Sequence, residues 1–177
     1  MIYADHAATT KISETAKLAM LSAMEKDWYN PSSLYTPGQQ ASGTLMDARV
    51  RIARCLGCLP KEIYFTSGGS EADNQAILSA AAIGKRQGKM HIISTAFEHH
   101  AVLHTLKKLE KEGFEITLLD VGEKGIVSPE QVEKAIRPDT ALVTVMYANN
   151  EIGTIQPIRE IGAVCRQNGV LFHTDAV

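Results

Sequence analysis

Four short groups of polar residues contain the side chains best suited to chemistry. They are the stretches Ser67–Ser70, Glu98–His100, Asn149–Glu151 and His173–Asp175. Each follows an apolar run of the kind that forms a buried strand. If these runs pair as parallel strands, their carboxyl ends meet at one edge of a sheet, which is where such sheets bind ligands. The sequence therefore predicts a single site built from all four groups.

The stretch Ser67–Ser70 contains two glycines and lies between a predicted strand and a predicted helix. Such a turn leaves backbone N–H groups accessible at the helix N-terminus, and these groups favour an anion such as a phosphate. Ser70 can add its hydroxyl, and Asp73 stands where the acid of a capping box would be. A capped helix without any ligand explains the same residues, so the turn alone leaves both interpretations open.

His99 and Asp175 have a narrower range of interpretations. A histidine at a strand end can stack on a planar ligand, transfer a proton or bind a metal, although a simple hydrogen-bonded histidine is more common. Asp175 follows an apolar run, and a buried carboxylate is costly unless a cation or a donor pairs with it. Its partner could be an arginine, a metal shared with His173, or a protonated heterocyclic nitrogen. Asn149 and Asn150 could donate to a ligand oxygen or tie their own loop together.

The elements that must position these groups alternate along the chain. Apolar runs predict strands at 63–66, 91–94, 116–119, 141–146 and 170–173, and helical periodicity predicts helices near 14–26, 41–56, 70–85, 102–109 and 157–169. A further helix start is predicted at Ser128, with Pro129 at its first position and Gln131 completing a capping box. This alternation predicts an α/β fold, with a mostly parallel sheet and helices on both faces.

The bulk composition excludes several classes of protein. The 177 residues are 45% hydrophobic and 21% charged, as in ordinary globular proteins, and the net charge of −2 gives no reason to expect a nucleic-acid partner. No apolar run reaches the ~20 residues that a membrane span needs. The pair Cys55 and Cys58 has no second pair to complete a zinc site, and three cysteines are too few for a disulfide framework. We expect a cytoplasmic protein with no membrane partner and no metal.

Taken together, the polar groups resemble the motifs of the cysteine desulfurases of the NifS/IscS type. These are class V aminotransferases and fold type I pyridoxal-phosphate enzymes. The matching stretches are Tyr3–Thr10, Asn30–Ser33, Phe65–Asn74, Glu98–Val102, Asn149–Gly153 and His173–Ala176. They occur in the family's order and with its spacing, and they extend over the whole chain.

The resemblance implies a role for each predicted site residue. Gly69 and Ser70 would bind the phosphate of pyridoxal 5′-phosphate, and His99 would stack over its pyridine ring as the catalytic residue. Asp175 would pair with the protonated pyridine nitrogen, so that the ring can act as an electron sink. Asn150 would lie near the ring hydroxyl and would also bind the substrate carboxylate.

The resemblance also implies a domain organisation. Residues 1–40 would form a segment and helix that wrap the core, with Ala7 at the substrate site. His6 departs from the family, in which asparagine is more usual at this position. Residues 41–177 would be the first part of the cofactor-binding large domain. The rest of that domain and the small C-terminal domain are absent from the sequence, so the large domain would be truncated.

The implied activity is the conversion of L-cysteine to L-alanine, with sulfur passed to an enzyme persulfide for iron–sulfur cluster assembly or tRNA thiolation. The implied partners are L-cysteine, a second copy in a homodimer, and sulfur-acceptor or scaffold proteins. In the family, a Schiff-base lysine follows soon after the residue matching Asp175, and the persulfide cysteine lies much further on. The last lysine here is Lys134 and the last cysteine is Cys165. We therefore expect these 177 residues alone to be inactive.

Other functions compete with this interpretation. One is a non-catalytic interaction or assembly module that keeps the same fold. Another is a related pyridoxal-phosphate lyase, such as a selenocysteine lyase. A third is a metal-dependent hydrolase that uses His99, His173 and Asp175, but it would leave the match of the stretch 67–74 to the desulfurases unexplained.

Overall fold

The structure is a computed structural model that describes residues 2–177. It divides into two compact units, one ending at Phe65 and one comprising Thr66–Val177. The prediction that residues 1–40 wrap the core stays a prediction.

The N-terminal unit is built from two helices whose ends follow local capping rules. Helix α1 (Glu14–Lys26) begins after Ser13, whose hydroxyl accepts a hydrogen bond from the N–H of Ala16 at 3.2 Å. Helix α2 (Thr36–Leu56) ends at Gly57, which takes the left-handed conformation with a φ of 69°. The predicted helix at 14–26 is confirmed, and the helix predicted at 41–56 begins earlier.

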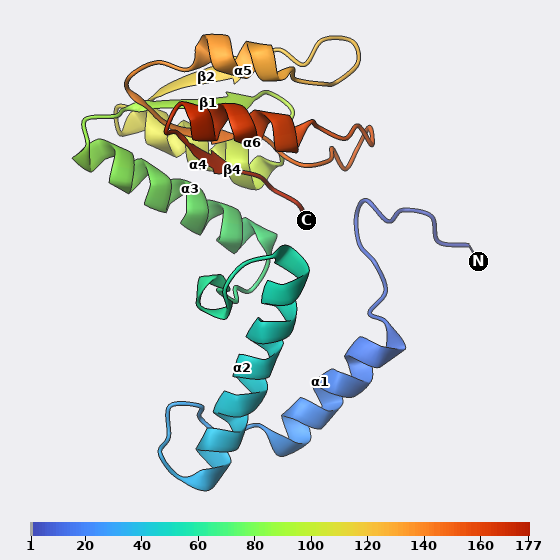
Figure 1. Ribbon diagram of the computed structural model, residues 1–177. Helices are drawn as coiled ribbons and strands as arrows, with labels where there is room; N and C mark the ends of the chain where they lie inside the picture. Colours follow the sequence, from blue (N-terminus) through green and yellow to red (C-terminus); the bar gives the residue numbers. More distant parts are fainter. Residues whose placement is uncertain (1) are drawn as a thin grey trace. The chain divides into compact units, whose positions relative to one another are not determined.

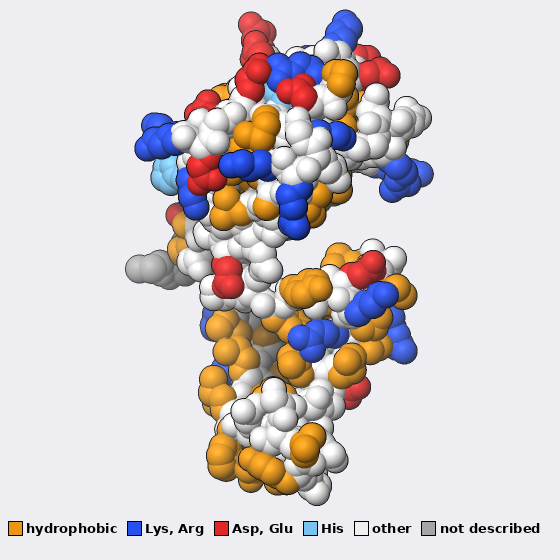
Figure 2. Space-filling model, turned by 90° about the vertical axis from the view of Figure 1, so that its left-hand side faces the viewer, with side chains coloured by type: hydrophobic (Ala, Val, Ile, Leu, Met, Phe, Trp, Pro, Cys, Tyr) orange, Lys and Arg blue, Asp and Glu red, His pale blue; other side chains and the backbone are white. Residues whose placement is uncertain are grey.

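Large apolar side chains lie on the surface of the N-terminal unit. No residue of α1 is buried, and Leu18, Met24 and Trp28 are 58%, 65% and 68% exposed. Figure 2 shows hydrophobic side chains, in orange, spread over this unit. Helices of globular proteins normally bury such residues, so the apolar side chains of α1 are left uncovered by the rest of the N-terminal unit.

The predicted strand at 63–66 is wrong. A short 3₁₀ helix, η1 (Pro60–Glu62), precedes this run, which is irregular. The backbone carbonyl of Ile63 accepts a hydrogen bond from Nε of Arg49 at 3.3 Å, and the Arg49 guanidinium lies 5.3 Å from the centre of the Phe65 ring. A strand needs hydrogen-bonded neighbours, and no strand of the described chain pairs with this run.

The C-terminal unit contains a parallel sheet of four strands in the order β2–β1–β3–β4. The strands are β1 (His91–Thr95), β2 (Glu115–Leu119), β3 (Thr140–Thr144) and β4 (Leu171–His173). The helices are α3 (Gly69–Arg86), α4 (His100–Lys111), α5 (Pro129–Ala135) and α6 (Ile158–Gln167). Helices α3 and α4 cover one face of the sheet, and α5 and α6 cover the other (Figure 1). The predicted α/β fold with helices on both faces is confirmed.

Alternate residues of the central strands pack into two separate cores. Ile92 and Leu142 point to the face covered by α3 and α4. Ile93 and Val143 point to the face covered by α5 and α6. Because side chains alternate along a strand, both faces of β1 and β3 must be apolar, which explains their continuous apolar runs.

The helix start predicted at Ser128 is confirmed in detail. The Ser128 hydroxyl accepts a hydrogen bond from the N–H of Gln131 at 3.2 Å, and the Gln131 side chain accepts one from the N–H of Ser128 at 2.8 Å. This is a complete capping box.

Within residues 2–177, none of the helices combines the length and the apolar character that a membrane span requires.

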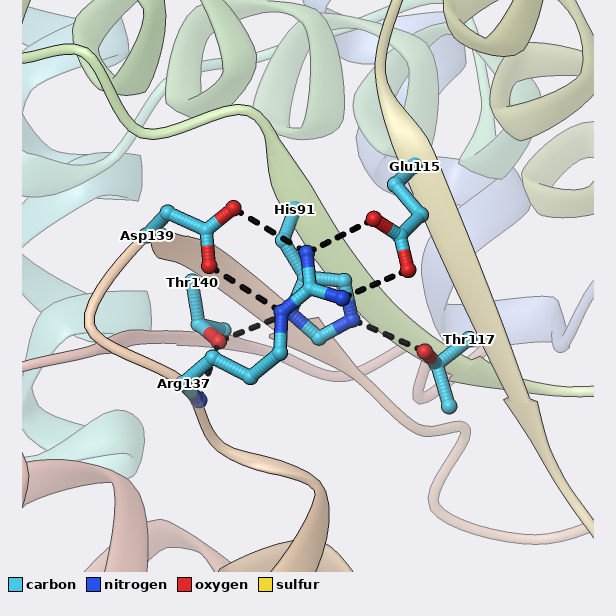
Figure 3. Close-up of polar contacts among 6 residues, drawn as sticks. All are labelled: His91, Glu115, Thr117, Arg137, Asp139 and Thr140. Atoms are coloured by element: carbon cyan, nitrogen blue, oxygen red, sulfur yellow. Dashed lines mark hydrogen bonds and ion pairs between the residues drawn. The ribbon is translucent and has the colours of Figure 1, made fainter.

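The amino end of the sheet is closed by a buried histidine. His91 is fully buried, and its two ring nitrogens lie 2.8 Å from the hydroxyls of Thr140 and Thr117 (Figure 3). The Thr140 hydroxyl also accepts a hydrogen bond from the N–H of Arg137, so its own proton is free to be donated to Nδ1 of His91. Each threonine hydroxyl can donate or accept, so both ring nitrogens of the neutral imidazole are satisfied in either tautomer.

Arg137 forms ion pairs with both carboxylates at this end of the sheet. Its guanidinium makes two hydrogen bonds to Glu115 and two to Asp139 (Figure 3). These hydrogen bonds lower the pKa of Glu115 and of Asp139. Burial, and secondly the charge of Arg137, lower the pKa of His91. At the amino end of the sheet, each charged group therefore has a charged hydrogen-bond partner, beside a neutral imidazole.

Candidate functional site

Helix α3 begins at the predicted glycine turn. Gly69 is its first residue and Ser70, which is exposed, is its second. No side chain caps the helix, and the backbone N–H groups of Gly69, Ser70 and Glu71 have no hydrogen-bond acceptor among residues 2–177. Free N–H groups at a helix N-terminus favour an anion, as the sequence predicted.

The turn before α3 is held in place by Glu71. Its carboxylate accepts hydrogen bonds from the backbone N–H and the hydroxyl of Ser67. These bonds lower the pKa of Glu71, first through the hydroxyl and then through the N–H. The Glu71 carboxylate therefore bonds to Ser67 and not to the first N–H groups of α3. Those N–H groups remain available to a ligand.

The predicted capping role of Asp73 is wrong. The N-cap position is Gly68, and Asp73 lies in the second turn of the helix, 4% exposed. Its Oδ1 lies 3.4 Å from Nε2 of His173, the last residue of β4. The rule for capping boxes fails here because the helix begins two residues earlier than a Ser70 cap would require, so Asp73 points inward.

His99 caps helix α4 and lies at the centre of the site. Its Nδ1 accepts a hydrogen bond from the N–H of Ala101 at 3.1 Å, which leaves the proton of the neutral ring on Nε2. The ring lines a hollow of about 400 Å³ together with Ser70. It also lines a second hollow, of about 260 Å³, together with Asn150. The structure therefore places His99 between two of the predicted site residues.

The two asparagines after β3 have different surroundings. Asn149 is buried, its Oδ1 accepts from the N–H groups of Glu151 and Ile152, and its Nδ2 donates to the carbonyl of Phe97. Asn149 therefore ties its loop together. Asn150 is exposed and lines the hollow beside His99, so its amide is the one free for a ligand.

Asp175 is buried close to His99. It is 8% exposed, and its Oδ1 accepts a hydrogen bond from the N–H of Val177 at 3.0 Å. One side-chain polar atom from each of Asp73, His99 and Asp175 lies within 4.8 Å of the other two. Val177 brings the same segment against α3, because a Cβ built on Gly69 would stand 2.5 Å from Cγ2 of Val177. The predicted meeting of Asp175, His99 and the glycine turn is confirmed.

The site carries an excess of buried negative charge. Burial, and secondly the Asp175 carboxylate, raise the pKa of Asp73 to about 6. Burial also raises the pKa of Glu98 to about 7, although the N–H of Met146 and the Thr95 hydroxyl donate to its Oε1. The second oxygen of Glu98 is buried without a hydrogen-bond partner in residues 2–177. A cation bound here would offset the cost of burying these carboxylates in their charged form.

His173 does not supply the missing positive charge. Its Nδ1 lies 2.8 Å from the Thr144 hydroxyl, and burial lowers its pKa. In residues 2–177, no lysine or arginine forms an ion pair with Asp73 or Asp175. The hydrolase alternative needed His99, His173 and Asp175 as metal ligands. In the structure the third residue close to His99 and Asp175 is Asp73. The His173 ring instead contacts Thr144 and Asp73.

Sequence reasoning missed Asp73 as part of the site, and it missed the burial of Glu98. Glu98 stood in a predicted group, but nothing local showed that it would be buried. Asp73 follows the glycine turn by four residues, which is one helical turn from Gly69. That spacing puts both residues on the same face of α3, and it was the one signal that could have found Asp73.

The N-terminal residue predicted to line the site stays a prediction. Ala7 is exposed and lies in a turn closed by a hydrogen bond from the N–H of Ala8 to the carbonyl of Asp5, at 3.2 Å. It belongs to the N-terminal unit, which is described separately from the site. His6 packs edge-on against the ring of Tyr3, with the ring centres 5.7 Å apart.

The C-terminal unit is thus a parallel α/β domain with a ligand site at the carboxyl ends of its strands. The site offers free N–H groups at α3 and buried carboxylates near His99. Residues 2–177 match the family model described as "Aminotransferase class-V". The chain belongs to the aminotransferase class-V family.

The most similar relatives include proteins named cysteine desulfurase. The chain is 49% identical to cysteine desulfurase IscS of Methanosarcina thermophila, and 49% identical to that of Clostridium botulinum. Each alignment covers 99% of this chain but only 43% and 44% of the relative. The chain therefore spans less than half the length of these relatives.

Solved structures agree with the sequence relatives. A NifS-like protein superposes with a TM-score of 0.93 at 36% identity, over 98% of this chain and 48% of that protein. The structure of SspA in complex with cysteine superposes with a TM-score of 0.92 at 40% identity, over 98% of this chain and 50% of SspA. The fold predicted from the resemblance, the large domain of a fold type I enzyme in part, is confirmed.

Proposed function

We propose that this chain forms the cofactor-binding part of a cysteine desulfurase that uses pyridoxal 5′-phosphate. The observation that carries the proposal is the position of Asp175, a buried carboxylate close to His99 and without an ion pair in residues 2–177. The names of the relatives support the activity, and the complex of SspA with cysteine supports L-cysteine as the substrate.

The residues present fit the three chemical parts of this cofactor. The free N–H groups of Gly69 and Ser70 would hold its phosphate. Asp175 would pair with the pyridine nitrogen and keep it protonated, and His99 would lie over the ring. Asn150 would donate to the ring hydroxyl and to the substrate carboxylate. When bound, the cofactor supplies an electron sink for bonds at the amino acid α-carbon.

His99 is the proposed proton carrier at the substrate side of the site. Because Nδ1 accepts the capping N–H of Ala101, only Nε2 is left to exchange a proton. The cap also fixes the orientation of the ring, since a rotated imidazole would leave the first turn of α4 without this acceptor. Glu98 is buried beside it, and its raised pKa keeps much of it neutral near pH 7.

Within residues 1–177, no lysine follows Lys134 and no cysteine follows Cys165. We therefore propose that these residues hold the cofactor without a covalent bond and do not release sulfur by themselves. In the whole enzyme we propose a cytoplasmic homodimer that passes sulfur to an acceptor or scaffold protein for iron–sulfur cluster assembly. The exposed apolar face of α1 supports a role for further protein in covering the N-terminal unit.

Binding of pyridoxal 5′-phosphate to the purified chain tests the proposal. We expect the wild-type chain to bind it, and the Asp175→Asn variant to bind at least about tenfold more weakly, because the cationic nitrogen loses its counter-charge. The matched control is Asp120→Asn, since Asp120 also follows a strand but is exposed. Equal binding by the wild-type and Asp175→Asn chains, measured by absorbance titration, would refute the assigned role.

A further inference from the structure

The strongest unassigned feature of the site is the proximity of two buried carboxyl groups on different elements. Asp73 comes from the second turn of α3, and Asp175 follows β4. They are 4% and 8% exposed, and one carboxylate oxygen of each lies within 4.8 Å of the other. At such a distance, in a buried site, two negative charges destabilise one another strongly.

The groups around Asp73 do not neutralise this pair. His173 faces Asp73 from β4, but burial favours its neutral form and its Nδ1 contacts the Thr144 hydroxyl. His99 faces it from the start of α4, with the neutral-ring proton on Nε2. Glu98, after β1, is a third acid and adds to the negative charge. Within residues 2–177, neither carboxylate has a lysine or arginine partner.

We propose that Asp73 and Asp175 form a coupled carboxyl pair that, at about pH 6 and below, holds one proton while the site is free of a cation and gives it up when a protonated ring nitrogen binds. The inference rests on the proposed function for the identity of that cation. Asp73 is then a positioning residue, because it acts on the ligand through the charge of Asp175.

The exchange balances in atoms and charge. In the ligand-free site below about pH 6, one O–H bond is present and the pair carries one negative charge. When a ligand arrives with its pyridine nitrogen protonated, the O–H bond breaks, the proton passes to water, and the pair carries two negative charges beside one positive charge. No oxidant, reductant or other reactant is needed.

A carboxyl titration tests the pair without any ligand. The ¹³C signal of the Asp73 carboxyl carbon is followed by NMR in the wild-type chain and in the Asp175→Asn variant. Because burial and Asp175 raise the pKa of Asp73 to about 6, the wild-type midpoint is expected near pH 6. In Asp175→Asn it should fall by about one pH unit or more. The control is Asp120→Asn, since Asp120 is an exposed carboxyl group outside the site.

Two outcomes of this titration would overturn the inference. One is an Asp73 midpoint near the ordinary value of 3.8 in the wild-type chain. The other is an elevated midpoint that Asp175→Asn leaves unchanged, because burial alone would then explain it. A chemical-shift map of the variant, compared with the wild type, confirms that the fold is intact.

Proton release on binding of pyridoxal 5′-phosphate tests the exchange. Calorimetry at pH 6 in two buffers of different ionisation enthalpy counts the protons. Both chains carry Glu98→Gln, so that Glu98 cannot contribute. We expect about half a proton more to be released per molecule bound with Asp73 present than with Asp73→Asn added, because any proton from the ligand's phosphate is released in both chains. A structural role alone would weaken binding and leave the proton count unchanged, which would overturn the exchange.

The two tests separate this inference from the proposed function. If the wild-type chain binds no pyridoxal 5′-phosphate, the proposed function fails, and the NMR titration alone decides whether the coupled pair exists. If the cofactor binds but the Asp73 carboxyl titrates independently of Asp175, the proposed function stands and the inference is wrong.

Discussion

The two ends of the four-stranded sheet differ in how their charges are paired. At the amino end, Arg137 bonds to both Glu115 and Asp139, and His91 has a hydroxyl partner at each ring nitrogen. At the carboxyl end, Asp73 and Asp175 are buried close together and no lysine or arginine of residues 2–177 pairs with them. The amino end satisfies its own polar groups, whereas the carboxyl end gathers charge that only a bound cation would balance.

This difference separates structural polar groups from functional ones. A buried polar network that is fully satisfied holds elements in one arrangement and stabilises the fold. A buried charge that is left unmatched costs stability, and proteins keep such costs mainly where they serve binding or catalysis. Both ends of the sheet combine a histidine with carboxylates. These groups stabilise the fold at the amino end and destabilise the ligand-free fold at the carboxyl end.

The largest expected effect is at the amino end. Replacing His91 with alanine removes a fully buried ring and leaves the hydroxyls of Thr117 and Thr140 without their partner. We expect the free energy of unfolding to fall by roughly 3 kcal/mol, from the cavity and the unsatisfied groups together. Urea unfolding measures the change. The exposed His104 is the matched control, and a His91→Ala loss no larger than that of His104→Ala would contradict the structural role.

At the carboxyl end, removing a charge should stabilise the ligand-free chain. Burial and Asp175 raise the pKa of Asp73 from 3.8 to about 6, so its ionised form costs nothing below about pH 4 and costs most above pH 6. We expect Asp73→Asn to match the wild type at about pH 4 and to be more stable by roughly 2–3 kcal/mol at pH 7. Urea unfolding across this pH range measures it. An Asp73→Asn variant that is less stable than the wild type at pH 7 would show that the carboxyl end is paired after all.

The pH dependence of the two ends should have opposite directions. Burial and Arg137 lower the pKa of His91, so the unfolded chain binds a proton that the folded chain resists. Stability from the neutral ring is therefore lost as the pH falls below the unfolded value of about 6.5. We expect the stability deficit of His91→Gln relative to the wild type to shrink between pH 7 and pH 5, as measured by chemical denaturation. Parallel curves for the two chains would mean that His91 does not resist protonation.

The smallest expected effect concerns the exposed part of the amino end. Arg137→Lys keeps the positive charge but loses the fork that bonds two carboxylates at once. We expect a small fall in the thermal unfolding midpoint at low salt, because the guanidinium is partly solvated. The fall should nearly vanish at about 1 M salt, where charges are screened over roughly 3 Å. A midpoint change independent of salt would assign the role of Arg137 to packing.

The order of helices and strands in the C-terminal unit could be predicted because its signals are local. The capping box at Ser128 and Gln131 involves residues three positions apart, and the run Thr140–Thr144 is apolar because both of its faces are buried. The run at 63–66 carried the same local signal and is not a strand. Its failure shows that an apolar run forms a strand only where a neighbouring strand supplies hydrogen bonds.

Most of the candidate site was also predictable, because each polar group follows its own strand or turn. Asp73 was not, since its local position suggested a cap and its inward orientation depends on α3 starting at Gly69. The burial of Glu98 depended on Met146, which lies on another part of the chain and donates to its carboxylate.

By itself, the sequence determined the secondary-structure alternation, the polar groups at the strand ends and the family of this protein. Periodicity, capping and turn chemistry act over a few residues, so they can be read directly from the chain. Only the tertiary structure decided which acids share one site and which have a positive partner. Burial and Coulomb interactions depend on distances between elements far apart in sequence, and the packing of α3 against β3 and β4 sets those distances for Asp73 and Asp175.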